Sequence, residues 1–124
     1  MKNNFLYILG VGVFSFFILF ISSTTWIEMA VEENCQEAIS VYGGECVPAL
    51  LAEVSDEQAS FHDRNDAIWS LGQLGDKRAL PVLESLQNGD ETQTKYNTQL
   101  SQYELTKAVN LLKSGVNLTK PFRW

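Results

Sequence analysis

Few side chains in this sequence are of the types that catalyse reactions or bind metal ions. The chain has one histidine, His62, and carboxylates lie near it in the sequence at Asp56, Glu57, Asp63 and Asp66. One histidine with carboxylates in a loop is a weak ligand set for a metal ion. We therefore expect a solvated loop here, and we predict no catalytic, cofactor-binding or metal-binding residue.

Two cysteines, Cys35 and Cys46, are the only thiols. Outside the cytoplasm two cysteines usually form a disulfide. The spacing argues against pairing, because a helix ending at Gly43 would separate them by about 10 Å, which is longer than a disulfide allows. In the unpaired alternative Cys35 is a small core residue. The sequence leaves both alternatives open.

Charge is unevenly distributed along the 124 residues, which are enough for one domain and carry a net charge of −6. This balance argues against nucleic acid as a partner. Residues 28–63 contain nine acidic residues and neither Lys nor Arg, whereas residues 64–124 contain six acidic and eight basic residues. The acidic stretch is either a solvated surface or a docking face for a basic protein partner. The candidate partner-binding residues are Glu53, Asp56, Glu57 and Trp69.

The N-terminal segment is apolar enough to enter a membrane. No charged residue occurs from Phe5 to Ile27, and a helix of this length spans about 33 Å, enough for the hydrocarbon core. We predict an anchor over residues 1–27 that contacts the membrane through Phe5 to Ile27; a cleaved signal peptide is the alternative. Lys2 before the apolar run places the N-terminus in the cytoplasm and the rest of the chain outside.

Residues 28–124 form the second predicted domain, and they contain an internal repeat. Residues 35–43 align with residues 67–75 at a spacing of 32, and residues 47–50 align with residues 80–83 at a spacing of 33. Each copy carries two helical apolar stripes separated by a glycine turn, with Pro81 in the opening turn of the second helix. A third amphipathic helix is expected over residues 100–114. The pattern predicts two helical hairpins and a capping helix.

The best-defined copy, residues 64–83, reads RNDAIWSLGQLGDKRALPVL and resembles a HEAT-like repeat of the bilin-lyase type. With the weaker first copy the resemblance covers residues 33–88, and the chain is also similar to small membrane-anchored bacterial HEAT-repeat proteins. The resemblance implies a stacked α-hairpin scaffold and does not imply lyase chemistry. HEAT-repeat iron hydroxylases carry a His-Glu pair where this chain has Asn65 and Asp66, so iron chemistry is not expected.

These observations together predict an all-α protein, in which a transmembrane helix precedes a short HEAT-like α-hairpin solenoid. We expect a noncatalytic, single-pass scaffold or adaptor that binds a protein partner outside the cytoplasm. Two alternatives remain at this stage. One is an accessory subunit of an enzyme related to HEAT-type lyases, and the other is a secreted binding module released by signal cleavage.

Overall fold

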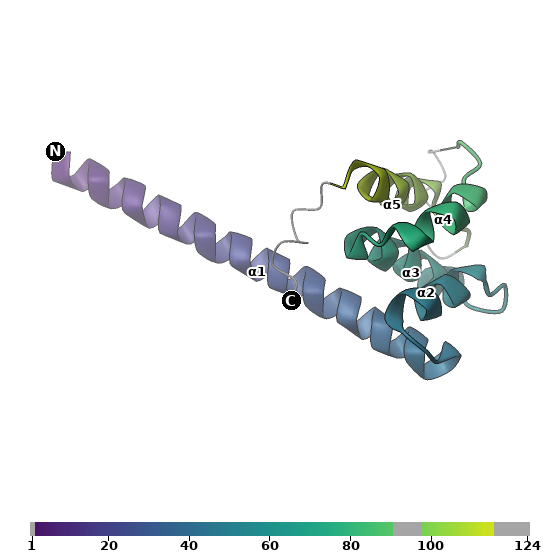
Figure 1. Ribbon diagram of the computed structural model, residues 1–124. Coiled ribbons are helices and arrows are strands. Elements are labelled where there is room, and N and C mark those ends of the chain that lie inside the picture. Colours follow the sequence, from purple (N-terminus) through teal and green to yellow (C-terminus); the bar gives the residue numbers. More distant parts are fainter. Residues whose placement is uncertain (1, 91–97, 116–124) are drawn as a thin grey trace.

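The computed structural model describes residues 2–90 and 98–115. Within these ranges the chain forms five α-helices and one 3-10 helix, and it contains no strand (Figure 1). The elements are α1 (Lys2–Tyr42), α2 (Cys46–Ser55), α3 (Phe61–Leu74), η1 (Lys77–Ala79), α4 (Leu80–Leu86) and α5 (Gln102–Ser114). The predicted all-α class, with packed hairpins behind a long apolar helix, is confirmed.

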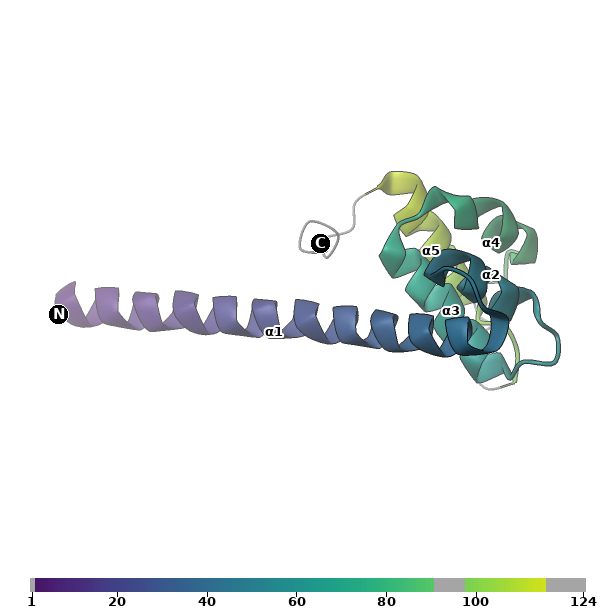
Figure 2. The same ribbon diagram turned by 60° about the horizontal axis from the view of Figure 1, so that its bottom comes forward.

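Helix α1 extends far beyond the packed domain as one continuous helix (Figure 2). Its N-terminal part is apolar on all sides and exposed, and by length and composition it could cross a membrane. The same helix continues past residue 28, where the sequence suggested a domain boundary, and ends at Tyr42. The last turns of α1 are therefore part of the domain, and Val31, Cys35 and Ala38 lie in its core.

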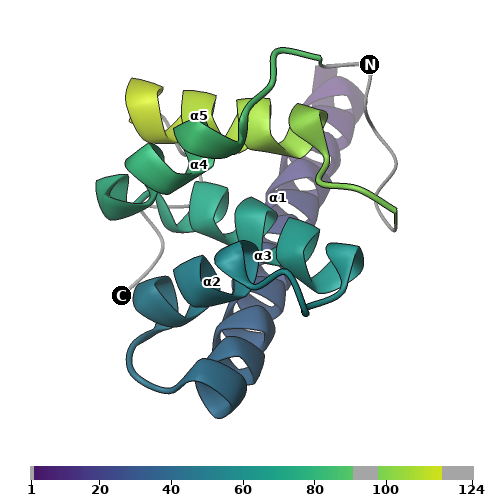
Figure 3. The same ribbon diagram turned by 90° about the vertical axis from the view of Figure 1, so that its right-hand side faces the viewer.

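The packed domain is a stack of helices built around α3, which contacts α1, α2 and α5 (Figure 3). Helix α4 packs against α5 at the far side of the stack. Gly75, with a φ of 66°, ends α3 in the left-handed conformation that glycine adopts without strain. Asp76 then accepts a hydrogen bond from the backbone N–H of Arg78 and is the N-cap of η1.

The apolar stripes of the predicted helices meet in one core. Leu50, Ile68, Leu71, Leu83 and Leu105 are fully buried, and they come from α2, α3, α4 and α5. Helix α5 begins two residues later than the predicted residue 100, because Ser101 is its N-cap and accepts a hydrogen bond from the backbone N–H of Glu104. The helices of the two hairpins pack together because their apolar stripes face this common core.

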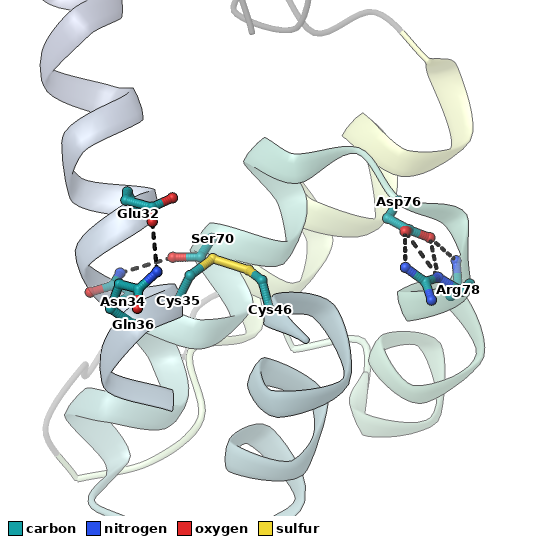
Figure 4. Close-up of a disulfide and its surroundings, with 8 residues drawn as sticks. All are labelled: Glu32, Asn34, Cys35, Gln36, Cys46, Ser70, Asp76 and Arg78. Atoms are coloured by element: carbon teal, nitrogen blue, oxygen red, sulfur yellow. Dashed lines mark hydrogen bonds and ion pairs between the residues drawn. A yellow bond between two sulfur atoms is a disulfide. The ribbon is translucent and has the colours of Figure 1, made fainter. Parts of the chain in front are cut away.

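Cys35 and Cys46 form a disulfide between α1 and α2, with their Cα atoms 4.9 Å apart (Figure 4). The sequence argument that helix length keeps the two cysteines too far apart is wrong, because the chain reverses direction between α1 and α2. Gly43 and Gly44 have φ values of 72° and 78°, which turn the chain back sharply beside α1. Cys46 thus starts α2 opposite Cys35, and the disulfide closes the first hairpin.

Candidate functional site

Three helices place four carboxylates around one small cavity. The cavity is lined by Asn34 and Glu37 of α1, Glu53 of α2, and Asp63 and Asp66 of α3. We call this set the acidic pocket. Its volume of about 10 Å³ leaves room for one water-sized group.

Helical spacing explains why these residues converge. Asn34 and Glu37 are three residues apart on α1, and Asp63 and Asp66 are three residues apart on α3, so each pair lies on one face of its helix. The side-chain amide of Asn34 donates a hydrogen bond of 2.8 Å to the Ser70 hydroxyl of α3 (Figure 4). This bond fastens α1 to α3 at the edge of the pocket.

Glu53 is the most buried residue of the acidic pocket. The residue is only 9% exposed, and its carboxyl makes no hydrogen bond or ion pair with any residue in the described ranges. Burial, followed by the nearby charges of Asp63, Glu37, Asp66 and Asp56, raises the pKa of Glu53 to about 7. A buried carboxylate without a partner is costly, so the proton is retained to near neutral pH.

The other carboxylates of the pocket are more exposed than Glu53. Glu37 and Asp63 are exposed, and Asp66 is half-buried with its Oδ2 atom 3.3 Å from Nε2 of His62. Arg64 is adjacent in sequence to Asp63, but its Nε donates a 2.9 Å hydrogen bond to the Val54 carbonyl. That carbonyl lies in the last turn of α2, where a positive charge is favourable. No Lys or Arg among the described residues lines the pocket.

Asp56 and Glu57, two other candidate partner-binding residues, lie outside the acidic pocket. The Tyr42 hydroxyl donates a 2.7 Å hydrogen bond to Oδ2 of Asp56, and the backbone N–H of Gln58 donates to Oδ1. The Tyr42 hydrogen bond is the main reason that the pKa of Asp56 is lowered and that of Tyr42 is raised to about 12. Asp56 thus joins the end of α1 to the end of α2, while Glu57 is exposed in the following loop.

Both aspartates of the acidic pocket lie in a segment with a recognisable family pattern. Residues 63–89 match the family model of the PBS lyase HEAT-like repeat. This match covers most of α3 together with η1 and α4, which form the second hairpin of the stack. No curated protein and no solved structure matches the chain.

Trp69, the remaining candidate partner-binding residue, belongs to α3 within this HEAT-like repeat. Its side chain is half-buried against the core, and it lines a narrow crevice with Gly72 of α3 and Lys107 and Ala108 of α5. The structure therefore places Trp69 in helix–helix packing. Of the four candidate residues, only Glu53 lines the acidic pocket.

Asn65 and Asp66, the two residues that the sequence places where a His-Glu pair was looked for, lie on α3 within the HEAT-like repeat. The Asn65 amide is fully buried, donates to the Gln99 carbonyl at 2.9 Å and accepts from the Ser101 backbone N–H at 2.8 Å. Asn65 therefore holds the start of α5 against α3. Across residues 2–90 and 98–115, no three acidic, histidine or cysteine side chains are grouped to hold a metal ion.

Glu37 and Asn34 were missed by reasoning from the sequence, as was the burial of Glu53. One signal was present. Helix α2 reads CVPALLAEVS, so Glu53 is its only charged residue and lies three residues after the buried Leu50. A lone carboxylate on the buried face of a helix is a candidate functional residue, because glutamate is rarely buried without a partner.

Proposed function

We propose that this protein is a noncatalytic adaptor, anchored in a membrane by the apolar part of α1, that binds a protein partner through its helical stack outside the cytoplasm. The continuity of α1 carries this proposal. One end of that helix is exposed and apolar, and the other end contributes Val31, Cys35 and Ala38 to the core of the domain. Because α1 belongs to both parts, a membrane that holds the apolar segment also keeps the domain next to it.

Two observations support a location of the domain outside the cytoplasm. The Cys35–Cys46 disulfide is of a kind that persists in oxidising compartments and is rare in the cytosol. Lys2 precedes the apolar segment, and no Lys or Arg follows it until Arg64. Positive charge is retained on the cytoplasmic side, which favours a cytoplasmic N-terminus.

A binding role suits the domain better than catalysis. Stacked helical repeats present extended surfaces that bind other proteins, and residues 63–89 match such a repeat. The reactive groups of the described part are engaged in structure: both thiols are in the disulfide, and His62 lies beside Asp66 on the surface.

The anchor is tested by separating membranes from the cells that make the protein and washing them at alkaline pH. We expect the full chain to stay in the membrane fraction, and mass spectrometry should find its N-terminus before Phe5. A variant with Val13→Lys and Phe17→Lys should leave the membrane, because charges at the bilayer centre are costly. A mature chain that begins near Thr25 would show signal cleavage and overturn the anchor.

The adaptor role is tested on the same membranes by chemical cross-linking through a C-terminal tag. The expected result is a cross-link to one protein partner at residues of α1 to α5 outside the apolar segment. Cross-links confined to lipid or to the apolar segment of α1 would contradict the role of the domain. Accessibility of the thiols to a membrane-impermeant reagent in intact cells, only after reduction, checks the orientation.

A further inference from the structure

We propose that the acidic pocket receives the ammonium group of a lysine side chain from the protein partner, an inference that rests on the adaptor function proposed above. The pocket lies where three helices of the stack meet, and its lining residues Glu37 and Asp63 are exposed to solvent. A protein partner can therefore reach it without unfolding the domain.

The burial of Glu53 without a hydrogen-bonding or ionic partner is the observation that points to a ligand. Its side chain is more than nine-tenths buried, lines the cavity, and has no partner among the described residues. Native proteins pair nearly all buried polar groups, because an unpaired group loses its hydration without compensation. A cation that enters the cavity would supply the missing partner and would favour the ionised form of Glu53.

The surroundings of Glu53 select for a cation. Glu37, Asp63 and Asp66 line the same cavity, and neither Lys nor Arg does. Their negative potential attracts positive groups during encounter and disfavours anions. The nearest cation in sequence, Arg64, bonds to the end of α2 instead.

The size of the cavity selects among cations. About 10 Å³ fits one water-sized group, and an ammonium is a compact point charge with three donors, whereas a guanidinium is a wider planar fork. Asn34, whose amide nitrogen bonds to Ser70, is the one uncharged residue among those that line the cavity. Hydrogen bonds to nitrogen span about 2.7–3.2 Å, so an ammonium tolerates a wider cage than calcium, whose oxygen ligands lie at about 2.3–2.6 Å. The described acidic residues are not grouped closely enough for a metal.

The experiment uses the full chain in phosphatidylcholine nanodiscs and a short, N-acetylated and C-amidated Gly/Ser peptide with one central lysine. Binding is followed by NMR shifts of isotope-labelled protein at neutral to mildly alkaline pH. Matched peptides carry acetyl-lysine or arginine in place of lysine. The test variant is Glu53→Gln, which removes the charge at nearly constant shape, and the control is Glu57→Gln, which removes an equal charge outside the pocket.

We expect the lysine peptide to shift signals of Asn34 and Asp66 and to bind Glu57→Gln as it binds the unaltered protein. Glu53→Gln should weaken binding about tenfold, in line with the loss of a charge-assisted hydrogen bond. The acetyl-lysine peptide should not bind, and the arginine peptide should bind more weakly. Circular dichroism of each variant checks that the helices are retained.

Four results would overturn the proposal: no binding of the lysine peptide, equal binding to Glu53→Gln, equal binding of the arginine peptide, or binding of acetyl-lysine. Saturable binding of Ca²⁺ that is lost in Glu53→Gln would assign the pocket to a metal ion and would likewise overturn it. The adaptor function fails separately, in the membrane and cross-linking tests. A chain that passes those tests and fails here binds its partner through another surface.

Discussion

Gly72 of α3 lies so close to Ala108 of α5 that a Cβ atom at position 72 would be 2.9 Å from both the Cα and the Cβ of Ala108. Real Cβ atoms essentially never approach other atoms so closely. The contact explains a glycine in the middle of a helix, a position at which glycine costs about 1 kcal/mol relative to alanine. Helices α3 and α5 touch at this point because neither residue has more than a methyl group.

We expect Gly72→Ala to destabilise the domain by about 1–3 kcal/mol, because the added methyl group overpacks the α3–α5 contact. Gly12→Ala is the matched control, since an added Cβ there meets no atom within 4 Å. Thermal unfolding of the full chain in detergent measures both. Equal melting temperatures for Gly72→Ala and the unaltered protein would contradict the close packing of these helices.

Asn65→Asp should cost about 1–3 kcal/mol of stability. The substitution replaces the donor to the Gln99 carbonyl with an acceptor, and it buries a new carboxyl at a site with no exposure. Asn110→Asp, on the exposed side of α5, is the control and should be nearly neutral. Hydrogen exchange provides a local measure: the Ser101 amide, which donates to Asn65, should lose protection in Asn65→Asp alone.

Removal of the disulfide should lower the free energy of unfolding by about 2–4 kcal/mol, because the unfolded chain gains freedom in the loop closed over a separation of 11 residues. The variant is Cys35→Ser with Cys46→Ser, and denaturant unfolding gives the change. A reducing agent should destabilise the unaltered protein by a similar amount and leave the double variant unchanged. Insensitivity of the unaltered protein to reduction would show that the bond is absent or without effect.

Stability should depend on pH through Glu53. Its pKa is about 7 in the folded protein against an ordinary 4.5, so between these values the folded chain holds a proton that the unfolded chain has lost. The free energy of unfolding should therefore fall as pH rises through this range, by up to about 3 kcal/mol, and then level off. The groups that face Glu53 are Glu37 of α1, Asp63 and Asp66 of α3, and Asp56.

Glu53→Gln should remove most of this decline, whereas Glu57→Gln should keep it. Chemical denaturation at pH 5 and pH 8 makes the comparison. Asp56 acts in a different range, because its lowered pKa gives stability that is lost only in acid, as pH falls below its ordinary 3.8. A decline of equal size in both Glu variants would assign the effect to other carboxylates.

The fold was largely predictable because it depends on patterns local in sequence. The apolar stripes of residues 67–83, the left-handed Gly75 and the position of Pro81 locate α3 and α4 with their turn. The continuity of α1 was not predictable in this way. The hydroxyls of Ser23, Thr24 and Thr25 bond to carbonyls one turn earlier, and the helix continues through these polar residues.

The acidic pocket was only partly predictable. The sequence shows an excess of acidic residues before Arg64, but helical rotation decides which of them face one another. Glu53 and Glu57 are four residues apart, yet α2 ends between them, so one is buried and the other is exposed. Tyr42, which binds Asp56 across the hairpin, has no sequence feature that marks it as a hydrogen-bond donor to that residue.

The unbroken helix from Lys2 to Tyr42 also fixes how the domain is oriented relative to the apolar segment, and so relative to a membrane under the anchor proposed above. An α-helix turns by about 100° per residue, so its two ends keep a fixed rotational phase. Rotation of the apolar end about the helix axis turns the acidic pocket through the same angle, since Asn34 and Glu37 belong to that helix. Insertion of one residue near Thr25 would redirect the pocket by more than a quarter turn and raise it by about 1.5 Å, with every contact inside the domain unchanged.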